Sequence, residues 1–147
     1  MRLHYRWHFG DDADNAGTLL PLGMNVSMPH EIFEPYKQHI SERQISRLYV
    51  VGSNDTTAPV IDASYRRFLA AMEAHLGNQK FMLGSRPGAG DFGLHGQLTQ
   101  LVGFDPTSRA IAHEVTPRTV AWVDQVHDQS GLEPTRQDWT NLEEQPE

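Results

Sequence analysis

The 147-residue sequence contains no cysteine, which excludes both a disulfide framework and a thiolate metal site. It also has no apolar run near the roughly 18 residues that a membrane-spanning helix needs. Basic side chains at Arg2, His4, Arg6 and His8 interrupt the N-terminal segment, which argues against a signal peptide. We therefore expect no membrane contact, and we predict a cytoplasmic protein, with which the absence of cysteine is compatible.

Basic side chains are also scarce. Twelve Lys and Arg residues stand against nineteen Asp and Glu residues, so the formal net charge is −7. The lysines, Lys37 and Lys80, lie far apart in the sequence. Because phosphate binding depends on clustered Lys and Arg, we expect no nucleic-acid partner.

Helical periodicity is the main pattern that the sequence does contain. In residues 57–76 the apolar positions recur on one face of a helix, with Pro59 in the first turn and Gly77 following the end. Helices are also predicted for residues 29–51, for 105–112, and from Thr116-Pro117 to about Val126. The expected fold class is all-α, a helical bundle that forms one domain over residues 1–130.

The segments between these helices are predicted from composition. Residues 10–28 are rich in Gly, Asp, Asn and Pro, which favours a long loop with a short helical turn near Leu19-Leu20. Residues 48–51 end the 29–51 helix or form a short strand. Residues 1–9 have no helix-start signal and are interpreted as the end of a helix that begins upstream. Residues 131–147 are acidic and lose periodicity, so we expect a poorly ordered tail.

A helix-start motif stands out in residues 81–98. Asp91 follows Gly88 by three residues, so its carboxylate can accept from the Gly88 N–H and faces the positive end of the helix dipole. Pro87 and Phe92 fall at the positions of a hydrophobic staple. Two helix-interior glycines, at 93 and 96, each cost about 1 kcal/mol relative to alanine. We therefore expect a neighbouring backbone to approach them closely.

The same segment carries a family resemblance. Its Leu-Gly-x-Arg-Pro-(x)3-Asp-Phe-x-Leu-x-Gly-Gln-Leu run, residues 83–98, resembles the loop and central helix of the all-helical C-terminal domain of glutathione transferases. That family usually has Ser or Thr where Gly88 stands and Ala where Gly90 stands. The resemblance extends more loosely from Pro59 to Val126, roughly half of the chain.

The resemblance implies a glutathione transferase-like function shared with a domain that this sequence lacks. In the family, glutathione and its activating residue belong to an N-terminal thioredoxin-like domain. This chain would hold no cofactor itself, with glutathione as co-substrate only where that domain is present. It would supply the hydrophobic substrate site and contacts to the thioredoxin-like domain or a second subunit. By itself, the chain is expected not to conjugate glutathione. The alternative function is a non-catalytic helical module for protein association. Under either function, the chain is a fragment of a longer protein or a stand-alone relative of the domain, and both alternatives stay open.

The candidate substrate-binding residues are Tyr5, Arg6, Trp7, His8 and Phe9. Aromatic side chains with cationic neighbours can line an apolar pocket that has a few polar anchors. In the family resembled, the end of the first helix of this domain helps to form the hydrophobic substrate site. The alternative for this cluster is a helix end packed into the core or against another domain.

The sequence contains no pattern typical of a metal site or of a catalytic serine. His4 and His8 would share a helix face, but no third metal ligand is placed by the sequence, so we predict a surface or interface pair and no metal site. Ser53, Ser64 and Ser85 lie in no Gly-x-Ser-x-Gly context. We therefore predict no catalytic residue in this chain and assign its Gly-Asp motif to helix capping.

Overall fold

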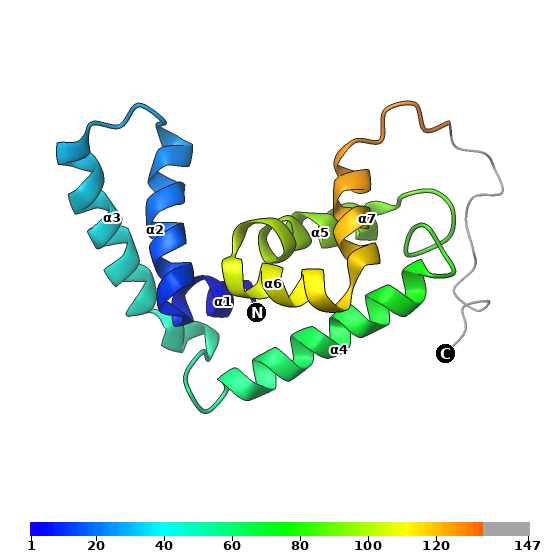
Figure 1. The fold of residues 1–147 in the computed structure, drawn as a ribbon, viewed down its shortest axis with the longest axis horizontal. Coiled ribbons are helices and arrows are strands. Elements are labelled where there is room, and N and C mark those ends of the chain that lie inside the picture. Colours follow the sequence, from blue (N-terminus) through cyan, green and yellow to red (C-terminus); the bar gives the residue numbers. More distant parts are fainter. Residues whose placement is uncertain (134–147) are drawn as a thin grey trace.

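The computed structural model describes residues 1–133, and in that range every regular element is helical (Figure 1). An isolated bridge between Phe81 and Gly84 is the one sheet-like pairing among these residues. The predicted all-α class is confirmed for this range, whereas residues 134–147 of the predicted tail lie outside it. The elements are α1 (Arg2–His8), α2 (Gly10–Met24), α3 (His30–Ile45), the 3-10 helix η1 (Leu48–Val51), α4 (Ala58–Leu76), α5 (Ala89–Leu98), the π-helical η2 (Thr99–Phe104), α6 (Pro106–Val115) and α7 (Pro117–His127).

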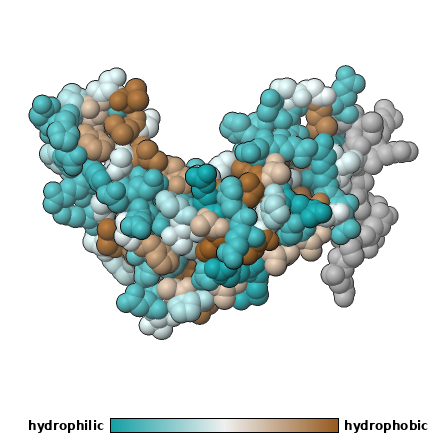
Figure 2. Space-filling view, viewed as in Figure 1, coloured by the Kyte–Doolittle hydropathy of each residue, from teal (hydrophilic) through white to brown (hydrophobic). Residues whose placement is uncertain are grey.

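The helices divide into a projecting hairpin and a packed body. Helices α2 and α3 lie side by side at one end of Figure 1, while α6 and α7 pack against the long α4 and α5 packs against α7. In the space-filling view these two parts flank a hollow (Figure 2). Helix α1 lies where they meet and packs against α2, α3, η1 and η2. It is therefore the element from which side chains reach both parts.

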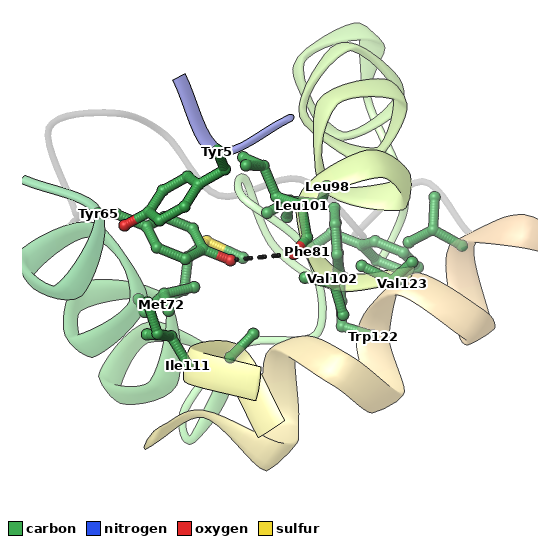
Figure 3. Packing of buried hydrophobic residues seen from close by; sticks show 13 residues of the cluster. Tyr5, Tyr65, Met72, Phe81, Leu98, Leu101, Val102, Ile111, Trp122 and Val123 are labelled. Carbon is green, nitrogen blue, oxygen red and sulfur yellow. Dashed lines mark hydrogen bonds between the residues drawn. The ribbon is translucent and has the colours of Figure 1, made fainter. Parts of the chain in front are cut away.

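The main core lies between α4 and the helices that follow it. Figure 3 shows Tyr65 and Met72 of α4 facing Leu101 and Ile111, with Trp122 of α7 on the other side. The polar tips of these side chains are satisfied: the Tyr65 hydroxyl donates to the carbonyl oxygens of Leu101 and Ser108, and the Trp122 indole N–H donates to that of Lys80. The helices predicted around residues 57–76 and 116–126 are thus confirmed and supply this core.

The predicted loop over residues 10–28 is wrong, because residues 10–24 form α2. Its composition is unfavourable for a helix, but tertiary contacts outweigh propensity. Asp12 is buried and its carboxylate accepts from the Thr107 backbone N–H (3.0 Å) and hydroxyl, at the first turn of α6. Ala13 and Ala16 pack in a small second core with Trp7. No local pattern reveals these partners.

The single helix predicted for residues 29–51 is shorter than expected. Helix α3 begins after Pro29, accommodates Pro35 inside it and ends at Ile45. Residues 48–51 form neither its last turn nor a strand, but the separate 3-10 helix η1. Gly52, with a φ of 68°, follows it in the left-handed conformation that glycine adopts without steric cost. The chain therefore turns here toward α4.

The predicted capping by Asp91 is present at the start of α5. Its carboxylate accepts from the Gly88 backbone N–H and from the Met82 backbone N–H, both at 2.9 Å. Asp91 is 1% exposed, so the carboxylate fastens the 81–88 loop to the helix from inside the protein. Phe92, which the sequence places in a staple with Pro87, keeps 51% of its surface exposed.

The close backbone approach predicted at Gly93 and Gly96 is wrong. A Cβ atom built on either residue meets nothing within 4 Å outside its chain neighbours and its own helix backbone. The close approach of two helices lies instead at Gly17 of α2, where a Cβ would come within 2.5 Å of the Ser41 hydroxyl oxygen on α3. The α5 glycines therefore lower helix stability without a packing gain that offsets it.

Substituting alanine for Gly93 or Gly96 should stabilise the protein by about 0.5–1 kcal/mol each, because alanine loses less backbone entropy and fills open space. The two gains should add in the double variant, and urea unfolding measures them. Gly17→Ala, which meets Ser41, is the control and should gain less. Destabilisation by Gly93→Ala would show that the helix needs a bare backbone there.

Candidate functional site

The five candidate residues of α1 and its end point in different directions. Tyr5 is fully buried in the main core, where its hydroxyl donates to Asp62 of α4 at 3.0 Å. Burial, together with this hydrogen bond, raises the pKa of the Tyr5 hydroxyl, which therefore stays protonated. Phe9 packs against the same core and His8 is half-buried near Asp55. These three side chains mainly hold α1 on α4 and the loop before it.

Arg6 is a buried clamp between α1 and the start of α6. Its Nε and Nη2 atoms donate to the two carboxylate oxygens of Asp105 at 2.8 and 3.1 Å, and Nη2 also donates to Gln100 at 2.7 Å. The guanidinium lies 4.4 Å from the centre of the Phe104 ring. Burial raises the pKa of the Asp105 carboxyl, while its bonds to Arg6 act in the opposite direction. The pair joins segments 99 residues apart.

His4 forms a buried hydrogen bond that no sequence pattern predicts. Its Nδ1 atom lies 2.8 Å from the Ser53 hydroxyl, 49 residues away, and its ring stacks on His8 with centroids 4.6 Å apart. Burial, then the proximity of His8, lowers the pKa of the His4 imidazole. Residues 1–133 contain no group of three side chains placed to bind a metal ion. The hydrogen bond thus ties α1 to the residue that follows the η1 turn.

A pocket of about 370 Å³ lies between α1 and the α3–η1 segment. We call it the α1–η1 pocket, and its volume is at the lower end of the range for small-molecule sites. Trp7 lines it from α1, so one of the five candidate residues reaches it. The apolar lining residues are Leu3, Trp7, Leu48, Tyr49, Val50 and Val51, and the polar ones are Gln44 and Arg47.

The η1 side of the pocket is unusually apolar for an exposed segment. Tyr49 and Val50 expose 76% and 68% of their surfaces, and Val51 is also exposed. Sequence reasoning treated these residues as a helix end and did not include them in the site. The available signal was the run of four apolar residues, 48–51, directly before Gly52. The pairing of this run with Trp7 depends on tertiary structure.

Comparisons with family models, curated proteins and solved structures find no match to this chain. Within residues 1–133, none of the helices has the combination of length and apolar character that crossing a bilayer requires. The geometry of the α1–η1 pocket is therefore the main basis on which a function is proposed.

Proposed function

We propose that this chain is the helical domain of a cytoplasmic glutathione transferase-like protein and that the α1–η1 pocket is its hydrophobic substrate site. The observation that supports this most is the pocket itself, in which a buried indole faces an exposed apolar segment. The buried Asp91 cap supports the family resemblance, because the motif from which it was inferred forms a helix start. Glutathione binding is assigned to a thioredoxin-like domain outside this sequence.

In this proposal the chain contributes binding rather than reacting groups. A ligand that covers Trp7 and the η1 side chains gains roughly 25 cal/mol for each Å² of apolar surface removed from water. Holding a hydrophobic electrophile in place beside glutathione would reduce the entropy cost of the reaction between them. The chain alone is then expected to bind apolar ligands without conjugating them.

The neutral fluorescent probe N-phenyl-1-naphthylamine should bind the purified chain and raise its stability by about 1.4 kcal/mol at a free concentration ten times its Kd. Fluorescence titration and thermal unfolding measure the two effects. Val50→Asp, which places a charge in the pocket, should weaken binding at least tenfold. Val60→Asp is the matched control, because Val60 is similarly exposed (65%) but lies on α4 and does not line the pocket. Equal affinities in both variants would contradict the proposed site.

Glutathione is the second ligand in that experiment. It should leave the melting temperature of this chain unchanged, because its binding is assigned to the absent domain. Turnover of glutathione with an electrophile by the purified chain would contradict this assignment.

A non-catalytic association module is the second candidate function. It is favoured by the α2–α3 hairpin, which projects from the body and exposes Met24, Val26 and Ile32 (Figure 1). The structure describes every residue of α3, and none of them is buried. Clusters of exposed apolar side chains commonly mark protein contacts. Loss of association on Met24→Ser, with probe binding unchanged, would favour this second function.

A further inference from the structure

Three residues that line the α1–η1 pocket carry side-chain hydrogen-bond donors without a partner in residues 1–133. Trp7 is 4% exposed and lines the pocket, yet its indole N–H makes no hydrogen bond in this range. The indole N–H of Trp122, by contrast, donates to the carbonyl oxygen of Lys80. The side chains of Gln44 and Arg47, which line the same pocket, also have no hydrogen bond or ion pair within residues 1–133.

The charge of the pocket differs in sign from that of the chain. Among the described residues that line the pocket, Arg47 carries a charge, and none is Asp or Glu. The groove between α2 and α3 differs, because it is lined by Asp14, Glu34 and Glu42, and its Lys37 is paired with Asp14 at 2.6 Å. In a chain of net charge −7, an anion is attracted to a pocket whose described lining includes a cation and no acidic residue.

We propose that the α1–η1 pocket binds an amphipathic carboxylate, with its apolar body against Trp7 and η1 and its carboxylate on Arg47. The planar guanidinium matches a carboxylate in a two-point hydrogen bond. The Trp7 side chain, which lines the same pocket, carries a further donor without a partner in residues 1–133. This inference rests on the pocket of the proposed function and names the chemical class of its ligand.

The test compares decanoate with 1-decanol by isothermal titration calorimetry on the full 147-residue chain. Their apolar bodies match, so the difference in affinity reports the head group. Decanoate should bind about tenfold more tightly than decanol, the size of effect expected for one charge-assisted hydrogen-bonded contact. Raising the salt concentration should weaken the binding of decanoate and leave that of decanol unchanged.

Two substitutions locate the carboxylate. Arg47→Gln should remove the preference for decanoate and keep decanol affinity within about twofold, since the apolar lining is intact. Arg43→Gln is the matched control, because Arg43 lies four residues earlier, in the last turn of α3, and carries the same charge but does not line the pocket. Arg47→Lys keeps the charge without the planar fork and should retain part of the preference.

The outcomes separate this inference from the proposed function. Equal binding of decanoate and decanol, or a preference that survives Arg47→Gln, would overturn the carboxylate assignment and leave the apolar site standing. Binding of neither ligand, together with no binding of the neutral naphthylamine probe, would overturn both. Circular dichroism and thermal unfolding of each variant show whether a lost affinity reflects lost folding.

Discussion

Replacing Arg6 with methionine should destabilise the protein by about 3–5 kcal/mol and lower its melting temperature by about 10–20 °C. The substitution keeps an apolar stem but leaves the Asp105 carboxylate buried without its cation. Removing one partner of a buried ion pair is far more costly than removing both. Thermal and urea unfolding of the Arg6→Met variant measure the loss.

The second substitution in this test distinguishes the unpaired charge from lost packing. Arg6→Met with Asp105→Leu removes both charges and should recover most of the stability. Arg66→Met is the surface control: Arg66 pairs with Asp62 at 2.9 Å, but both side chains are exposed, so its loss should cost far less stability than the loss of Arg6. A double variant as unstable as Arg6→Met alone would mean that Arg6 acts through its contacts with Gln100 and Phe104.

The helices that could be predicted are those whose apolar spacing and start signals lie within their own segment of the sequence. Residues 58–76 place apolar side chains on one helix face, and Thr116-Pro117 is a helix start of the common cap-then-proline type. Helix α2 could not be predicted, because its composition favours a loop and it is held by the Asp12 contact to Thr107, 95 residues away. Long-range hydrogen bonds of this kind leave no spacing pattern in the sequence.

The role of individual glycines also depends on tertiary contacts that the sequence does not show. The cost of Gly93 and Gly96 in a helix follows from the sequence, but the reason inferred for it, a close neighbour, is wrong. The residue that does sit against another helix, Gly17, lay in a segment expected to be a loop. Propensity therefore identifies an unusual glycine, while only the packing shows which one is needed.

The candidate site was predicted in part. The aromatic cluster at residues 5–9 drew attention to Trp7, which lines the pocket. Tyr5 and Arg6 are equally plausible ligand contacts from the sequence, but their hydrogen bonds to Asp62 and Asp105 hold them in the interior. The opposite side of the pocket, residues 47–51, joins Trp7 only through the position of α1 against η1. Which members of a cluster face a ligand thus depends on partners elsewhere in the chain.

Asp91→Ala should destabilise the protein by about 3 kcal/mol, because it leaves two backbone N–H groups in the 81–91 segment without their acceptor. The Gly88 and Met82 N–H groups each lose a 2.9 Å bond to a carboxylate oxygen, and bonds to charged groups contribute about 1.5–3 kcal/mol each before partial replacement by water. The negative charge at the helix start is lost as well. Urea unfolding should show a lower midpoint with an unchanged slope.

Matched substitutions test whether the cost comes from these two bonds. Asp91→Asn keeps one acceptor oxygen in nearly the same shape, so it should lose about half as much stability. Asp124→Ala removes an exposed carboxylate of α7 that makes no side-chain hydrogen bond within residues 1–133, and it should change stability by less than about 0.5 kcal/mol. Hydrogen exchange at the Gly88 and Met82 amides should accelerate in Asp91→Ala while amides in α4 follow global unfolding. If those two amides stayed protected, the 81–88 loop would be held by packing around Phe81 and not by the carboxylate.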